Sequence, residues 1–114
     1  MGALSRRKGA TWERELVHRF REVLPDAEIK RGLQYRSGEE APDVEVPCFF
    51  LEAKHHHRTN IKAALRQAEA AAPKGRWPIA VCKDDRQPAV VAMDLEDFLD
   101  LLGQWWSGLL RELR

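Results

Sequence analysis

The chain is predicted to fold as a single α/β domain spanning residues 1–114. Three stretches repeat apolar residues at helical spacing, and short apolar runs bounded by turn residues lie between them, which gives the order αββ(β)αββα. With 44% hydrophobic and 32% charged residues, the composition is that of a globular protein. A length of 114 residues allows one buried core and is too short for two ordinary domains.

The first helix is expected to begin at residue 5 or 8 and to end at residue 24, before Pro25. At about 100° per residue its apolar positions form one continuous face. They are Trp12, Leu16, Val17, Phe20, Val23 and Leu24. Glu13 projects from the middle of this stripe, where an acid without a partner is costly. Glu13 is therefore a candidate functional residue.

Three strands are expected between the first and the second helix, at residues 28–32, 43–46 and 49–54. The polar loop GLQYRSGEEAP separates the first of these strands from the other two. Because only Pro47 and Cys48 lie between the last two strands, these strands should form a hairpin.

A second helix is expected over residues 59–72, with Thr59 or Asn60 as its N-terminal cap. Its apolar face comprises Ile61, Ala64, Leu65, Ala68, Ala71 and Ala72. Gln67 borders that face. Two further strands, PIAVCK and AVVAM, should pair across the polar turn DDRQP, and Asp94 can cap the helix that follows.

Residues 95–114 are predicted to form a C-terminal amphipathic helical segment. Apolar residues recur there in pairs one turn apart, and Gly103 and Gly108 interrupt the pattern. They are Leu101, Leu102, Trp105, Trp106, Leu109, Leu110 and Leu113. This stripe either closes the core of its own subunit or forms the interface of a homodimer, and the sequence favours neither.

Charge is distributed unevenly, although the formal net charge is only +1. Residues 54–76 contain six Lys or Arg and one acid, whereas residues 94–100 contain four acids and no base. The basic stretch favours an anionic partner bound on one face, and the alternative is an ordinary solvated helix surface.

No segment suggests export or insertion into a membrane. The amino terminus MGALSRRKGA lacks an apolar signal core, and no run of 18 apolar residues is present. We therefore expect a cytoplasmic protein. In that reducing compartment Cys48 and Cys82, which both lie in apolar runs, are expected to be buried core residues rather than a disulfide.

The stretch FFLEAKHHHR places two opposite charges on one face of a strand. Residues two apart share a face, so Glu52 and Lys54 point the same way as Phe50. If the hairpin forms, Asp43 comes near Glu52, and Glu13 can reach both from a helix packed on the sheet. Clustered carboxylates repel one another, and a hard cation such as Mg²⁺ removes that repulsion. The alternative is a structural ion pair between Glu52 and Lys54.

The consecutive histidines His55, His56 and His57 do not by themselves predict a zinc site. Neighbouring side chains point in different directions, and no HxxxH or CxxC motif accompanies them. We expect them at the rim of the carboxylate site, where imidazole can hydrogen-bond a phosphate.

Four segments in this order resemble the PD-(D/E)xK nuclease superfamily, and more narrowly its archaeal and phage Holliday junction resolvases. They are KGATWERELV at residues 8–17, PDV at 42–44, LEAK at 51–54, and the following helix with Gln67. The resemblance extends over residues from about 8 to 93. It implies a restriction-endonuclease-like core, in which a mixed central β-sheet is flanked by α-helices.

The resemblance also implies roles for individual residues. The catalytic residues would be Glu13, Asp43, Glu52, Lys54 and Gln67. The metal ligands would be Glu13, Asp43, Glu52 and the backbone carbonyl of Ala53, with Mg²⁺ as the cofactor and Mn²⁺ able to replace it. Arg14 and either Arg31 or Arg36 would correspond to basic residues that meet the DNA backbone. The distribution of charges by itself adds as candidate DNA-binding residues Arg6, Arg7, Lys8, His55, Arg58 and Lys62. The loop GLQYRSGEEAP departs from the shorter glycine-serine loop expected of archaeal relatives.

The function implied by the resemblance is Mg²⁺-dependent resolution of Holliday junctions by paired symmetric nicks that leave 5′-phosphate and 3′-hydroxyl ends. The partners would be branched DNA and a second subunit, with no membrane and no small-molecule substrate, in a bacterial, archaeal or phage-infected cell. Three alternatives stay open. They are a nuclease for flaps, forks or restriction sites, a noncatalytic DNA-binding homologue, and a small structural protein with a dimerising tail.

Overall fold

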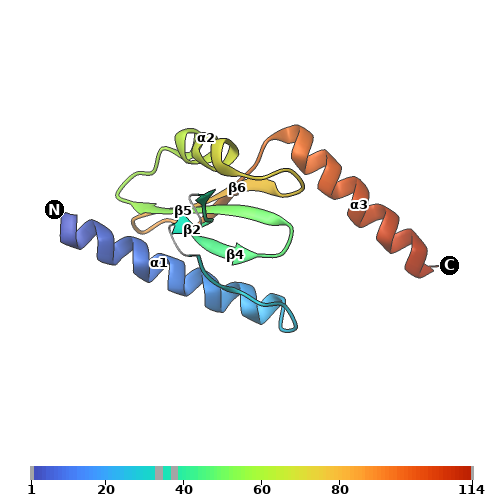
Figure 1. Ribbon diagram of the computed structural model, residues 1–114, viewed down its shortest axis with the longest axis horizontal. Helices are drawn as coiled ribbons and strands as arrows, with labels where there is room; N and C mark the ends of the chain where they lie inside the picture. Colours follow the sequence, from blue (N-terminus) through green and yellow to red (C-terminus); the bar gives the residue numbers. More distant parts are fainter. Residues whose placement is uncertain (1, 33–34, 37–38, 114) are drawn as a thin grey trace.

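The structure is a computed structural model that describes residues 2–32, 35–36 and 39–113, excluding the side chains of residues 2–6, 35–36, 39–40, 110 and 112–113. The described helices are α1 (Gly2–Val23), α2 (Ile61–Ala71) and α3 (Leu95–Leu113). The described strands are β1 (Lys30–Arg31), β2 (Tyr35–Arg36), β3 (Glu39–Glu40), β4 (Val44–Val46), β5 (Phe49–His56), β6 (Trp77–Asp84) and β7 (Val90–Ala92). Figure 1 shows their arrangement.

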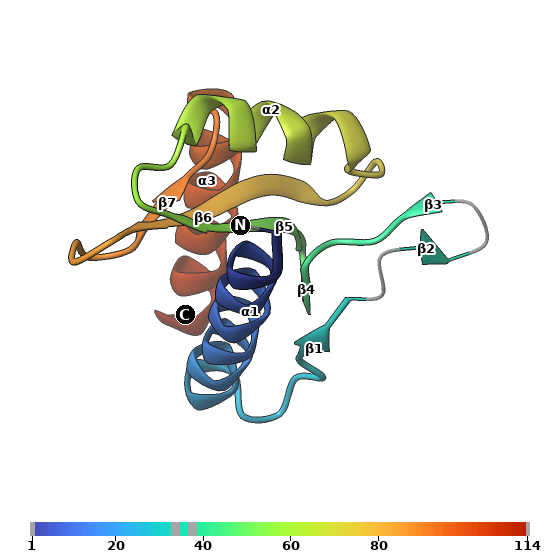
Figure 2. The same ribbon diagram turned by 90° about the vertical axis from the view of Figure 1, so that its left-hand side faces the viewer.

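Five of the described strands form one sheet in the order β1-β4-β5-β6-β7. β5 and β6 run parallel, joined by a crossover through α2, and the other neighbours are antiparallel. α1 packs on β4 and β5, and α2 packs on β5 and β6 from the opposite side (Figure 2). The predicted α/β fold, with a mixed central sheet flanked by helices, is confirmed.

The core has a layer on each side of the sheet, because successive residues of β5 and β6 point to opposite faces. The larger layer, under α1, comprises Trp12, Leu16, Val17, Ile29, Val44, Val46, Leu51, Ala53, Ile79 and Val81. The smaller layer, under α2, comprises Ala64, Leu65, Ala80 and Cys82. The indole of Trp12 donates a hydrogen bond of 3.2 Å to the carbonyl of Val81, which satisfies its polar atom inside the core.

Local signals placed both hairpins and the second helix correctly. Val46 pairs with Phe49 across the Pro47–Cys48 turn, and Cys82 pairs with Val90. Asn60 caps α2, because its side chain accepts a hydrogen bond from the backbone N–H of Ala63. The first expected strand is only two residues long, and the expected loop after it contains the short β2–β3 hairpin.

Burial was predicted wrongly at several positions, including Ile61 of α2, which is 37% exposed. Val23 is 76% exposed and Leu24 is 39% exposed. The strand nearest to this end of α1, β1, is only two residues long and does not cover them. Cys48 is exposed, because it occupies the hairpin turn at a φ of 71°, outside the regular pleat. Cys82 is buried as predicted, and both cysteines are free.

α3 projects away from the sheet (Figure 1). The radius of gyration is 15.0 Å, compared with about 13 Å for a compact domain of this length. Gly103 and Gly108 lie within the continuous helix. Of the two alternatives left open for the stripe of this helix, closure of its own core does not fit the structure, because Trp105 is 59% exposed and Trp106 is 52% exposed. None of the described helices is long and apolar enough to cross a membrane.

Candidate functional site

The β4–β5 hairpin fixes Asp43 beside Glu52. The backbone N–H of Asp43 donates a hydrogen bond of 2.9 Å to the carbonyl of Leu51, one residue before Glu52. One carboxylate oxygen of Asp43, Oδ2, accepts a hydrogen bond of 2.8 Å from the backbone N–H of Ala53, one residue after Glu52. Asp43 is therefore held against β5 by one hydrogen bond from its backbone and one to its side chain, on either side of Glu52.

Glu52 and Lys54 lie on the face of β5 that the strand alternation predicted. Their neighbours Leu51 and Ala53 belong to the layer under α1, so Glu52 and Lys54 point to the other face. Glu52 is buried, with 7% of its surface exposed. The ammonium Nζ of Lys54 lies 3.5 Å from Oε1 of Glu52. A buried acid and a partly exposed amine thus stand together at this face.

The carboxyl groups of Asp43 and Glu52 are hydrogen-bonded to each other, with Glu52 as the donor. Burial, and next the negative charge of Asp43, raises the pKa of Glu52 to about 7, although Lys54 opposes the shift. Burial also raises the pKa of Asp43, against the effect of the Ala53 N–H and of Lys54. Near neutral pH the pair therefore retains a proton for a substantial fraction of the time.

Glu13 lies close enough to Asp43 for the two charges to interact, but its carboxylate is bound by an arginine. Oε1 of Glu13 accepts a hydrogen bond of 3.1 Å from Nε of Arg31 and forms an ion pair with Nη2 at 3.0 Å. Burial and then the charge of Asp43 raise the pKa of Glu13, while Arg31 lowers it. The described partner of Arg31 is an acid of the candidate site, and its predicted contact with DNA stays a prediction.

Among the described residues, no three His, Cys, Asp or Glu side chains are arranged as a group that could hold a metal ion. Asp43 and Glu52 stand together, whereas Glu13 is engaged by Arg31. The two central acids nevertheless fit a hard divalent cation, because they supply oxygen donors, and burial, which raises the pKa of both, favours a cation that would balance their charge. Arg31 contacts only Oε1 of Glu13, so Glu13 could join them through its other carboxylate oxygen or after release from Arg31.

Gln67 is not joined to this group by any described contact. It is exposed on α2, outside the face that packs on the sheet. Ala53 is buried in β5, where its N–H binds Asp43. The role predicted for Gln67 remains a prediction.

A second polar cluster lies where the parallel strands β5 and β6 end. Oδ1 of Asp85 lies 2.6 Å from Nζ of Lys8 and 3.1 Å from Nε2 of His55. Lys8, through its hydrogen bond and charge, lowers the pKa of Asp85. The rings of His55 and of Trp12 in α1 form a T-shaped pair. His55 therefore lies on the face of the sheet that α1 covers, opposite to Lys54. Sequence reasoning treated Asp85 only as a turn residue and missed this contact.

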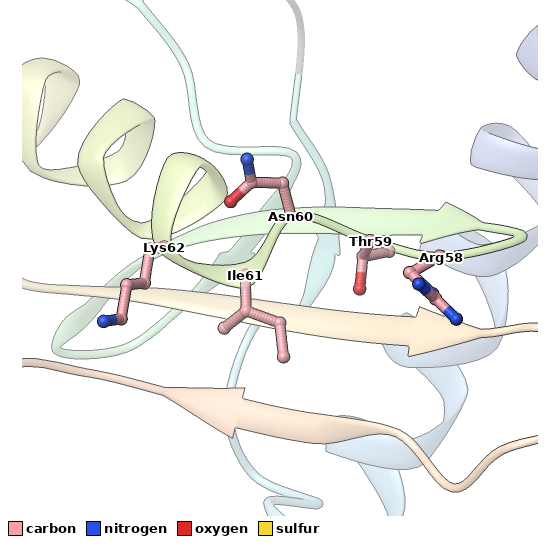
Figure 3. Close-up of a pocket in the computed structure, with 5 residues that line it drawn as sticks. All are labelled: Arg58, Thr59, Asn60, Ile61 and Lys62. Carbon is pink, nitrogen blue, oxygen red and sulfur yellow. The ribbon is translucent and has the colours of Figure 1, made fainter.

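Several residues predicted to bind DNA have exposed side chains in the structure. Arg58 and Lys62 line an open pocket of about 450 Å³ together with Thr59, Asn60 and Ile61 (Figure 3). Thr59 is fixed there, because its hydroxyl donates a hydrogen bond of 2.6 Å to Asp84. Arg7 and Arg14 are exposed on α1. The side chains of Arg6 and Arg36 lie outside the described residues.

The candidate site therefore consists of Asp43, Glu52 and Lys54 on one hairpin, with the ion pair of Glu13 and Arg31 beside it. None of these site residues lines the basic pocket at the start of α2. In comparisons with known proteins, no protein-family model, no curated protein and no solved structure matches the chain.

Proposed function

We propose that the chain is a Mg²⁺-dependent, structure-selective DNA endonuclease with a restriction-endonuclease-like core, and that it resolves four-way junctions by paired nicks. The observation that supports this proposal best is the group formed by Asp43, Glu52 and Lys54. Burial raises the pKa of both acids, so placing them here destabilises the fold. A functional role explains this arrangement better than a structural one.

The residues that would hold the cation are Asp43 and Glu52, with the carbonyl of Ala53 and with Glu13. Bound Mg²⁺ would neutralise the acids, lower the pKa of a water molecule and stabilise charge on a phosphoryl oxygen. Mn²⁺ accepts the same oxygen ligands and is expected to replace it. Deprotonation of Glu52 is a requirement of this arrangement, so cation binding should strengthen as the pH rises through about 7.

Lys54 would provide the hydrogen-bond donor. Its side chain is 30% exposed, so Lys54 can reach a solvent-side ligand while its ammonium group stays 3.5 Å from Glu52. We assign it to orient the attacking water or to donate to a phosphoryl oxygen. The water oxygen would form a bond to phosphorus and release a proton to solvent, the bond from phosphorus to O3′ would break, and O3′ would take a proton from solvent. The products carry a 5′-phosphate and a 3′-hydroxyl.

The exposed basic residues would bind the phosphate backbone. Arg7, Arg58 and Lys62 carry positive charge that is free to meet DNA phosphates, and Arg14 lies on the same helix as Arg7. Such contacts position the duplex without reading its sequence, and they weaken steeply with salt. Two subunits would be required for paired nicks, because one chain supplies one such site.

The experiment that tests this function compares cutting of a four-way junction, a flap, a fork and a linear duplex of equal length, with Mg²⁺ or with a chelator. Wild type should cut the junction symmetrically and only with the metal. Asp43→Asn should lose this activity by about 10²-fold or more, because the amide removes a ligand charge but can still accept from Ala53.

Asp26→Asn, an exposed position in the turn after α1, is the matched control and should cut like wild type. Equal cutting of all four DNAs would reject the junction as the preferred substrate and assign a general nuclease. Tight junction binding without cutting, in wild type as in Asp43→Asn, would identify a noncatalytic DNA-binding homologue.

A further inference from the structure

α3 turns its apolar side away from its own subunit. The residues of this apolar stripe are Leu95, Phe98, Leu99, Leu102, Trp105 and Trp106, and all are exposed by 44% or more. At about 100° per residue they fall on one side of the helix. Asp97, Asp100 and Gln104 fall on the other side. The described hydrogen bond between α3 and the sheet uses that polar side, because the Trp77 indole donates to Oδ2 of Asp100 at 3.1 Å.

This orientation is the reverse of an ordinary surface helix, which packs its apolar side on the core. Three aromatic side chains, exposed by 45%, 59% and 52%, alone leave uncovered about 300 Å². That is already the size of the largest apolar patch on a typical monomer. With the three leucines added, the stripe supplies more than half of the roughly 800 Å² per partner that a standard interface buries.

We propose that the apolar stripe pairs with the same stripe of a second copy of this chain, as two antiparallel helices related by a two-fold axis near Leu102. The spacing of Leu95, Phe98, Leu102, Trp105 and Leu109 alternates three and four residues, which is the spacing of a coiled-coil seam. A self-complementary stripe closes into a two-fold dimer without leaving a free edge. The inference rests on α3 alone and does not depend on the proposed nuclease activity.

The charges of α3 favour the antiparallel arrangement. The first turn carries Glu96 and Asp97, and the last turn carries Arg111. A parallel pair would place the acidic first turns of both copies side by side, whereas an antiparallel pair brings each toward the basic end of its partner. The same charges disfavour a lipid surface, because membrane-surface helices carry Lys and Arg on the polar side, and here that side carries Asp97 and Asp100.

Gly103 and Gly108 are consistent with close approach by a second helix. A Cβ atom built at either position would have no neighbour within 4 Å in the described chain. The fold of one subunit therefore does not require glycine there, although each glycine costs a helix about 1 kcal/mol relative to alanine. The missing side chains leave room around the stripe for a partner backbone.

Sedimentation of the full chain tests the interface. Wild type should be a dimer at about 100 µM and dissociate on dilution. Leu102→Glu combined with Trp105→Glu should be a monomer at the same concentration, because two buried charges would face each other across the axis. Gln104→Glu combined with Ser107→Glu adds the same charge to the polar side of the same helix and should remain a dimer. Circular dichroism establishes that both variants keep their helix content.

A wild-type chain that stays monomeric at this concentration would overturn the inference, as would equal dissociation of the two double variants. Wild-type monomers that bind phosphatidylserine vesicles would instead assign the stripe to a lipid surface.

Orientation has its own test, in a Cys48→Ser background. Leu102→Cys should cross-link with itself under mild oxidation, and Leu95→Cys should cross-link with Leu109→Cys but not with itself. Self-linking of Leu95→Cys without the mixed product would show a parallel pair and reject the antiparallel arrangement.

Discussion

The β4–β5 hairpin and α3 depart from the usual partition of residues in opposite ways. The hairpin places two acids, Asp43 and Glu52, against the sheet, and several short contacts hold them there. α3 places large apolar side chains in solvent. Buried charge and exposed apolar surface are the two informative exceptions in a folded protein. The first indicates a site for a small charged ligand, whereas the second indicates a surface for another macromolecule.

The largest expected effect falls on the chemistry of the hairpin. Lys54→Met should lower the rate of Mg²⁺-dependent junction cutting about 10³-fold, because the site loses its hydrogen-bond donor. Junction affinity should change little, since DNA binding depends on other basic residues. Lys74→Met, in the exposed turn before β6, is the control. Single-turnover cutting and gel-shift titrations separate the two quantities. Loss of binding in step with cutting would show that Lys54 acts only as a phosphate contact.

Truncating a leucine should destabilise the protein much more in β5 than in α3. Leu51 is fully buried beneath α1, so Leu51→Ala should lower the free energy of unfolding by about 3 kcal/mol. Leu102 is 44% exposed, so Leu102→Ala should cost less than about 0.5 kcal/mol in dilute monomer. Urea unfolding at low protein concentration measures both. A large loss for Leu102→Ala in the monomer would show that α3 packs on its own subunit.

The pH dependence of stability tests the buried acids. The pKa of Glu52 is raised from 4.5 to about 7 in the folded protein. The folded state therefore binds a proton that the unfolded state has released, and stability falls as the pH rises from about 4.5 to 7. Glu52→Gln should remove this loss and be more stable than wild type by about 2 kcal/mol near pH 8. The difference should shrink toward pH 5. If the free energy of unfolding of the two proteins changes with pH in the same way, the raised pKa of Glu52 is contradicted.

The smallest effect concerns the ion pair of Glu13 and Arg31. If Arg31 competes with a cation for Glu13, Arg31→Gln should tighten Mg²⁺ binding several-fold, which is about 1 kcal/mol. Isothermal titration calorimetry with Mg²⁺ in the absence of DNA measures the affinity of both proteins for the cation. Lys30→Gln, one residue away and paired with Glu28 and Glu45, is the control. Weaker Mg²⁺ binding in Arg31→Gln would show that the arginine organises the site instead of blocking it.

Local patterns in the sequence predicted the strand face of the site. Period-two alternation placed Glu52 and Lys54 together, and the two-residue turn brought Asp43 to them. Helical periodicity placed Glu13 on the side of α1 that packs on the sheet, and its charge does reach Asp43. These features depend only on residues that are close in sequence or on one regular element.

Other features could not be predicted, because they depend on contacts between distant segments. Arg31 meets Glu13 only once β1 returns beside α1, and His55 meets Asp85 only once β5 and β6 pair. Periodicity defines the apolar stripe of α3, but it does not say whether that stripe faces inward or outward. Burial of Cys48 was inferred from its apolar neighbours, and the positive φ of the turn overrode them.

The two cysteines differ in exposure, so their reactivity can report on the structure of the chain. Cys48 is exposed at the tip of the hairpin, four residues before Glu52, whereas Cys82 is 1% exposed between α2 and the sheet. Burial also raises the pKa of the Cys82 thiol, which lowers its thiolate fraction. A thiol reagent should therefore label Cys48 at once, at the turn of the hairpin that carries the proposed site, and Cys82 only when the domain opens. One reaction, followed over time, would report local access and global opening separately.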